Sequence, residues 1–131
     1  MDQQETFQQL TVLDRNYSAT AEQIQMVEQE LEGLSEFLSS LEHLGKNQEK
    51  KMLAPLGRGI FIPADRRNEK LFVEVGAEVF VRKSPQEAVL VVKEQLSRLN
   101  EVLVQLRTQE SFYASQLQEL LARAEKAKPE G

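Results

Sequence analysis

Histidine and cysteine, which often serve as metal ligands or as catalytic bases and nucleophiles, are nearly absent from this sequence. The only histidine, His43, follows Glu42, and the chain has no cysteine, so no second histidine or thiolate exists to complete a zinc site. The favoured role for His43 is therefore a charge partner near a helix end. Gly57-Arg58-Gly59 lacks the phosphate-binding pattern G-x-x-x-x-G-K-[ST] and predicts a turn. We expect no catalytic residue, no metal, no cofactor and no enzyme activity.

The net charge narrows the classes of partner. The 131 residues carry 16 Lys and Arg against 21 Asp and Glu, a net charge of −5. Nucleic acids and anionic membranes attract basic surfaces, so neither is expected as a partner. The longest aliphatic run, residues 88–92, is far shorter than the roughly 20 residues of a membrane span. The polar, acidic first ten residues are not expected to form a signal peptide, and the lack of cysteine fits a reducing compartment.

The charge is divided along the chain in a way that predicts three segments. Residues 1–45 carry nine acids and one base, residues 46–83 five acids and nine bases, and residues 84–131 seven acids and six bases. In the first segment apolar residues recur every three and four positions from Leu10 to Leu41. Such heptads predict a coiled-coil helix whose a and d positions form an apolar seam. We expect the helix to end at Gly45.

The third segment begins with a strong helix-start signal and then repeats the heptads. Ser84-Pro85-Gln86-Glu87 combines a capping serine, a proline at the first helical position and a glutamate that can complete a capping box. Its seam runs over positions 89–124. The third segment is therefore predicted to be a second coiled-coil helix.

The two predicted helices should fold back on each other as an antiparallel pair. Thr20 is the only polar break in ten seam positions of the first helix, and Glu110 is the only charged break in the second. Pairing residues whose numbers sum to 130, such as Leu41 with Val89, places both breaks in one layer. Other heptad registers would leave each polar group against hydrocarbon, which is unfavourable.

The middle segment is predicted to form two β-hairpins, over residues 51–64 and 70–83. Residues 52–83 hold three of the six glycines and two of the four prolines, and these break any helical pattern. The expected strands are 51–56 and 59–64 in the first hairpin, and the expected connection in the second is Gly76-Ala77.

The predicted hairpins carry more apolar side chains than one small sheet can bury. An isolated hairpin is marginal in water, and exposed strand edges pair with other chains. We therefore predict an oligomerisation surface, with a self-contained β cap on a monomer as the alternative. Its residues are Leu56, Ile60, Phe61, Ile62, Phe72, Val73, Val75, Val79, Phe80 and Val81.

Arg66, Arg67 and Lys70 form a basic segment between the two hairpins. A solvated turn is the favoured interpretation, because charged clusters in turns are usually hydrated. Docking to an acidic partner surface is the alternative.

Four short stretches of the middle segment resemble the strand motifs of a known family. They are Leu53-Ala54-Pro55-Leu56-Gly57, Gly59-Ile60-Phe61-Ile62-Pro63, Val73-Glu74-Val75-Gly76 and Val79-Phe80-Val81. In this order and spacing, between two heptad helices, they resemble the α class of prefoldin subunits over nearly the whole chain. Glu78 departs from the resemblance, since a small residue, commonly glycine, is expected there.

The resemblance implies an α+β, mainly α fold: a long antiparallel two-helix coiled coil with two β-hairpins at its connecting end that form an oligomeric β-barrel platform. It implies a hexamer of two α-class and four β-class subunits, an ATP-independent chaperone of the holdase type. Non-native client proteins would bind at the coil tips and pass to a cytosolic group II chaperonin, in the cytoplasm. A structural or adaptor coiled-coil subunit of a prefoldin-like scaffold complex is the alternative.

Client binding is expected at the end of the coil opposite the hairpins, over residues 1–13 and 112–131. Apolar residues off the seam are candidates there, because exposed apolar groups often bind other molecules. Seam leucines join them if the coil end frays, although closing the coil is the favoured role for those leucines. The candidates are Phe7, Val12, Phe112 and Leu121 off the seam and Leu10, Leu117 and Leu120 on it.

Overall fold

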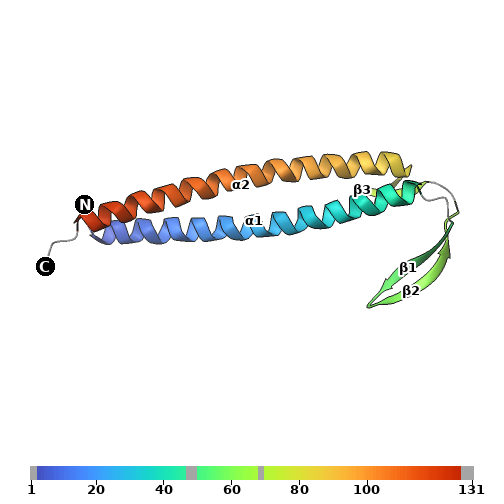
Figure 1. Ribbon diagram of the computed structural model, residues 1–131, viewed down its shortest axis with the longest axis horizontal. Helices are drawn as coiled ribbons and strands as arrows, with labels where there is room; N and C mark the ends of the chain where they lie inside the picture. Colours follow the sequence, from blue (N-terminus) through green and yellow to red (C-terminus); the bar gives the residue numbers. More distant parts are fainter. Residues whose placement is uncertain (1–2, 47–49, 68–69, 128–131) are drawn as a thin grey trace. The chain divides into compact units, whose positions relative to one another are not determined.

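The computed structural model describes residues 3–46, 50–67 and 70–127. The elements in chain order are α1 (Gln3–Lys46), β1 (Lys51–Gly57), β2 (Ile60–Asp65), β3 (Leu71–Gly76), β4 (Val79–Lys83) and α2 (Pro85–Ala127). The two long helices pack antiparallel, with the two hairpins between them in the chain, so the fold is mainly α as predicted (Figure 1). Within the described ranges, no helix is long and apolar enough to cross a membrane.

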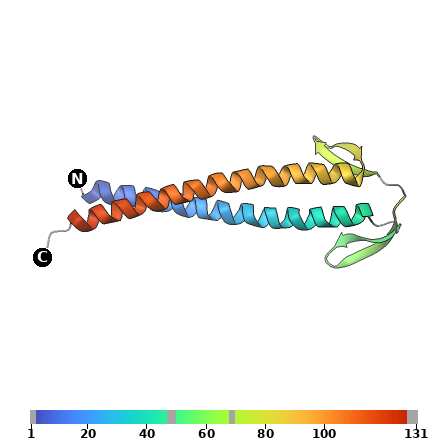
Figure 2. The ribbon, with the colours of Figure 1, turned by 45° about the horizontal axis from the view of Figure 1, so that its top comes forward.

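The chain forms two compact units. The first, here called the coil unit, contains residues 3–32 of α1 and 97–127 of α2. The second, the hairpin unit, contains residues 33–96, which include both hairpins and the adjoining parts of the two helices. Within the coil unit the beginning of α1 and the end of α2 lie side by side (Figure 2).

Burial in the coil unit follows the predicted seam. Ile24, Leu103 and Leu120 are buried, and Thr20 is buried with them at 5% exposure. Glu110, the other polar break, is half-buried. The two interruptions therefore occupy seam positions in the structure as well as in the pattern.

An ion pair flanks the seam of the coil unit. The guanidinium Nη2 of Arg107 donates to Oε1 of Glu28 at 3.0 Å. Helical side chains lean toward the N-terminus of their own helix, so in an antiparallel pair these two side chains lean toward each other. Their residue numbers sum to 135, which is compatible with the predicted register.

The register is visible in the hairpin unit, where α1 and α2 approach closely. A Cβ added at Gly45 would lie 3.3 Å from the Cβ of Pro85, and these two numbers sum to 130. Leu41, Ala88 and Val92 form a buried cluster. Packed against the cluster are Leu34, Leu38, Leu71, Val89 and Leu96. The predicted register is therefore confirmed in this unit.

The end of α1 lies one residue beyond the predicted end at Gly45. The helix continues through Gly45 to Lys46. The second helix passes so close here that a side chain at this position would require Pro85 to shift slightly. Gly45 is therefore a close packing contact as well as a residue near the helix end.

The two hairpins share one backbone design, repeated nineteen residues further along the chain. Each is a separate two-stranded antiparallel sheet. The pairing of β1 with β2 shifts between Pro55 and Gly57, and that of β3 with β4 shifts between Glu74 and Gly76. A bulge therefore precedes both turns and increases the local twist.

Both turns contain three successive residues with positive φ. At the third of these the first turn has a glycine and the second a glutamate. Gly59 has φ +80° and its counterpart Glu78 has φ +61°, whereas the residues before them, Arg58 and Ala77, have similar values of +54° and +50°. A residue with a side chain pays roughly 1–2 kcal/mol for this conformation. The second turn thus lies at Ala77-Glu78 and not at Gly76-Ala77, because the bulge places Gly76 at the end of β3.

Alanine at Gly33 and at Gly45 should have different effects. Alanine stabilises a helix interior by about 1 kcal/mol relative to glycine, because of its higher helix propensity. Nothing lies within 4 Å of a Cβ added at Gly33. Gly33→Ala should raise the free energy of unfolding by about that amount. Gly45→Ala should gain less or lose stability, because Pro85 must move. Thermal unfolding followed by circular dichroism compares them, and equal gains would contradict the close approach.

Replacing Glu78 by glycine should relieve the second turn. Glu78→Gly should raise the free energy of unfolding by about 1 kcal/mol, since the left-handed backbone no longer carries a side chain. The matched variant Gly59→Ala should lower it by a similar amount. Nothing lies within 4 Å of its added Cβ, so the loss would come from the backbone alone. Denaturant titration measures both, and a destabilised Glu78→Gly protein would refute the assignment of strain.

Candidate functional site

The hairpins carry most of the exposed large apolar side chains in the described part of the chain. Of the ten residues predicted for oligomerisation, nine are exposed, by 39% to 67%, and Val73 is half-buried. Met52 and Leu53 are also exposed but were not among the predicted residues. Exposed apolar patches of this kind are typical of surfaces that bind other molecules.

The hairpin of β1 and β2 exposes apolar side chains on both faces. Side chains alternate between the faces of a strand, and the pairing of Leu53 with Pro63 puts Leu53 and Phe61 on one face. Met52 and Ile62 lie on the other face, and all four are exposed. A two-stranded sheet with neither face covered is marginal in water.

The hairpin of β3 and β4 is attached to the helices by one face. Leu71 packs against the buried cluster of Leu41, Ala88 and Val92. On the opposite face Phe72 and Phe80 are exposed. The Arg82 guanidinium lies 5.4 Å from the centroid of the Phe72 ring, a cation–π contact across the strand pair. This hairpin therefore keeps one apolar face free.

An apolar groove of about 490 Å³ lies between β3 and the helices of the hairpin unit. Phe37 and Leu44 line it from α1, Val91 from α2 and Val73 from β3. Its lining is suited to an apolar side chain. The groove explains why Val73 and Val91 remain half-buried although they face the helix–hairpin boundary.

The basic segment between the hairpins is attached to the end of α1. The guanidinium Nη1 of Arg66 donates to the carbonyl oxygen of Leu44 at 2.9 Å, and the backbone N–H of Arg66 donates to the carbonyl of Lys50 at 2.6 Å. A cation at the C-terminal end of a helix is stabilising, because carbonyl groups there lack helical partners. Arg66 therefore has a structural role beyond that of a solvated turn residue, while Arg67 is exposed.

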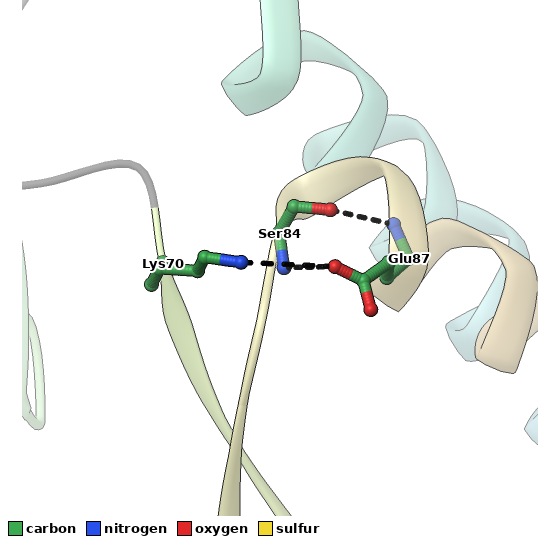
Figure 3. Close-up of polar contacts among 3 residues, drawn as sticks. All are labelled: Lys70, Ser84 and Glu87. Atoms are coloured by element: carbon green, nitrogen blue, oxygen red, sulfur yellow. Dashed lines mark hydrogen bonds and ion pairs between the residues drawn. The ribbon is translucent and has the colours of Figure 1, made fainter.

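The start of α2 has the predicted capping box, and Lys70 reaches it (Figure 3). The backbone N–H of Ser84 donates to Glu87 Oε1 at 3.2 Å, and the N–H of Glu87 donates to Ser84 Oγ at 3.1 Å. Lys70 Nζ lies 3.9 Å from the same carboxylate oxygen. The pKa of Glu87 is lowered, most strongly by the hydrogen bond from the Ser84 backbone and next by the hydrogen bond with the Ser84 side chain. The positive charges of Lys70 and Lys83 lower it further.

In the coil unit the four off-seam candidates are exposed and one seam candidate is not. Phe7, Val12, Phe112 and Leu121 are exposed by 71%, 54%, 59% and 52%. Leu10 and Leu117 are half-buried, and Leu120 is buried at 7% exposure. Leu120 thus closes the seam and is left out of the candidate surface.

The ring of Phe112 contacts the coil but remains largely in solvent. It meets the Tyr113 ring edge-on, with centroids 5.9 Å apart and planes inclined by 62°. More than half of Phe112 is nevertheless exposed. Packing along the coil and accessibility to a ligand are therefore compatible at this residue.

Three further exposed apolar residues of the coil unit were missed from the sequence. They are Met26, Val102 and Val104. The predicted client-binding region covered residues 1–13 and 112–131, and none of the three lies there. A heptad position outside a and d is the signal that identifies each of them.

The described residues contain no group of three or more His, Cys, Asp or Glu side chains that could hold a metal ion. His43 is exposed in the last turn of α1. Among described residues that are not exposed, no buried side-chain nitrogen or oxygen lacks a hydrogen-bond partner.

Comparison with known proteins is consistent across sequence and structure. The family model for the prefoldin subunit matches residues 8–129. Prefoldin subunit alpha of Methanococcus vannielii is 29% identical over 107 residues, covering 81% of this chain and 72% of the relative. Prefoldin subunit alpha of Methanococcus maripaludis strain C5 is 30% identical over 94 residues, covering 67% and 65%.

A solved structure shares the fold. The cryo-EM structure of filamentous PFD from Methanocaldococcus jannaschii matches with a TM-score of 0.75 and 17% sequence identity. The match covers 88% of this chain and 97% of that chain. At this identity the likeness concerns the fold alone.

Acidification should weaken the contribution of Glu87. The pKa of Glu87 in the folded chain is lowered from the ordinary 4.5. Its contribution to folding stability is therefore present above the pKa of the unfolded chain and is lost as the pH falls through the pKa of the folded chain. Glu87→Gln should be less stable than the unmodified chain at pH 7, and the difference should shrink toward pH 3. Thermal unfolding at both pH values tests this, with the exposed Glu101→Gln as the control. A difference independent of pH would contradict the capping role.

Proposed function

The chain belongs to the prefoldin family as an α-class subunit, and on this premise we propose that it is part of an ATP-independent holdase. The family is a non-enzymatic chaperone family whose subunits assemble with one another. The proposed complex is a hexamer of two α-class and four β-class subunits, in which the hairpins contribute to a β-barrel platform. Its clients are non-native proteins, which it passes to a group II chaperonin in the cytoplasm.

The observation that carries this proposal is the exposure of apolar side chains in two separate regions. The hairpins expose apolar faces that a two-stranded sheet cannot cover by itself. The coil unit exposes Phe7, Val12, Phe112 and Leu121, which the seam does not use. The first set supports assembly with other subunits, and the second supports contact with clients.

The proposed mechanism is weak capture at several points. One coil offers little apolar area, so a single contact holds a client only briefly. Several coils on one platform raise the effective concentration of binding sites, and the combined affinity exceeds that of each contact. No covalent bond is made or broken, and the sequence has no phosphate-binding glycine–lysine pattern that nucleotide-driven release would use.

Replacing the four exposed coil residues by serine should separate assembly from client binding. A variant with Phe7, Val12, Phe112 and Leu121 all changed to serine should still form the hexamer with a β-class subunit. The concentration of variant complex needed for half-maximal suppression of aggregation should rise roughly tenfold. A tenfold change corresponds to about 1.4 kcal/mol of binding free energy, which the loss of four exposed apolar side chains can supply. Light scattering gives the mass, and aggregation of a denatured protein without nucleotide gives the activity.

The matched control for this variant is Leu90→Ser. Leu90 is a similarly exposed apolar residue, but it lies in the hairpin unit. Its replacement should leave suppression unchanged. If the fourfold variant suppressed aggregation as well as the unmodified complex, client binding at these residues would be refuted. If the unmodified hexamer formed but suppressed nothing, an adaptor role would replace the holdase.

A further inference from the structure

The ion pair of Glu28 with Arg107 identifies one flank of the coil unit. With Leu10 and Leu103 at a positions, both charged residues occupy e positions. In each helix e and b lie on one side of the seam, and g and c lie on the other. Because Glu28 and Arg107 meet at 3.0 Å, the e and b positions of the two helices share a side. The g and c positions therefore share the opposite side, here called the neutral flank.

Over positions 102–116 of α2 and the facing positions 14–28 of α1, about 21 Å of the coil, the neutral flank has no charged side chain. Beyond them Glu119, at the next c position of α2, lies level with Val12 in the predicted register. On α1 the g and c positions from 9 to 26 are Gln9, Val12, Asn16, Ala19, Gln23 and Met26. On α2 the corresponding positions from 102 to 116 are Val102, Gln105, Gln109, Phe112 and Gln116. Nine of these eleven residues are exposed, and Asn16 and Gln116 are half-buried.

The opposite flank is apolar in places but charged. It carries Phe7, Val104 and Leu121, all exposed. Over the same part of the coil, however, it also carries Asp14 and the pair of Glu28 with Arg107. A ligand lying along this side would have to desolvate charges, which is costly. The two flanks therefore differ in charge more than in apolar content.

The side chains of the neutral flank suit an extended polypeptide of variable sequence. Each glutamine amide offers two donors and an acceptor, which can satisfy the backbone N–H and C=O groups of an unfolded segment. Between the amides lie four exposed apolar residues, Val12, Met26, Val102 and Phe112. Methionine adapts its shape to different apolar partners. Neither kind of contact requires a particular client sequence.

Charge complementarity indicates which segments the flank would favour. Residues 1–32 carry seven acids and one base, and residues 97–131 carry five of each. A negatively charged coil attracts basic segments over several ångströms and repels acidic ones. A second copy of the same coil carries the same negative charge, so the flank is a poor surface for self-association.

We propose that the neutral flank is the main client-binding face of the coil unit and that it takes extended, apolar, net-basic segments of non-native proteins. This proposal rests on the holdase function and specifies its surface and its client class. Val12 and Phe112 belong to this face together with Met26 and Val102, so they make more of the client contact than Phe7 and Leu121, which lie on the opposite flank.

Two pairs of lysine substitutions test the proposal. Gln23→Lys with Gln109→Lys places two positive charges on the neutral flank, and Gln25→Lys with Gln118→Lys places them on the opposite one. All four glutamines are exposed and lie within the two helices, and both double variants change the net charge equally. The probes are two labelled unstructured peptides of leucine, serine and lysine, or of leucine, serine and glutamate, measured by fluorescence anisotropy with the assembled complex.

The unmodified complex should bind the lysine peptide about tenfold more tightly than the glutamate peptide. The neutral-flank variant should lose about tenfold in affinity for the lysine peptide, and the opposite-flank variant less than about twofold. Equal losses in both variants, or equal affinity for both peptides, would overturn the proposal. So would a change of assembled mass in the neutral-flank variant alone, since that would show another subunit covering the flank.

The same measurements separate this proposal from the holdase function itself. If the unmodified complex suppresses aggregation but both double variants bind the lysine peptide alike, the assignment of client binding to the neutral flank is wrong and the holdase function stands. If the unmodified complex neither suppresses aggregation nor binds either peptide, the holdase function fails and this proposal fails with it.

Discussion

The pairing of the two heptad seams is the constraint on which the rest of the structure depends. Because seam residues of α1 and α2 are buried against each other, every other helical position acquires a fixed side of the coil. The close approach of Gly45 to Pro85 sets the register in the hairpin unit. The capping box at Ser84 then fixes where α2 begins. Together these contacts determine which apolar side chains remain for other molecules.

The two units leave apolar surface exposed for different physical reasons. In the hairpins the sheets have only two strands each, so there is too little structure to cover both faces. In the coil unit the exposed residues are simply off the seam and could have been polar without loss to the coil. Exposure in the hairpins is thus a consequence of the fold, whereas exposure in the coil unit is a property of the particular side chains.

The sequence predicted the elements well because strong local signals specify them. Heptads over both flanks and the Ser84–Glu87 capping box gave the helices, and glycines and prolines gave the hairpins. Features that depend on a distant residue were missed or misread. The packing role of Gly45 becomes evident only when Pro85 is placed beside it. Arg66 looks solvated until the end of α1 lies within reach of its guanidinium.

The candidate binding residues were predicted only in part, for a related reason. An off-seam apolar residue can be recognised from its heptad position, and Phe7, Val12, Phe112 and Leu121 were found in this way. Leu120 could not be assigned without knowing whether the coil remains closed at that level, and it does. The difference in charge between the two flanks depends on which sides of the helices coincide, and the contact of Glu28 with Arg107 supplies that fact.

The unequal covering of the two hairpins has a consequence for the thermodynamics of association. The β3–β4 hairpin is already held by Leu71 against the helices, so a neighbour meets a pre-organised body and little conformational entropy is lost. The β1–β2 hairpin has both faces in solvent, so contact with a neighbour would restrict it more. Although the two hairpins repeat one backbone design, a single chain thus offers one docking element held by the helices and one with neither face covered.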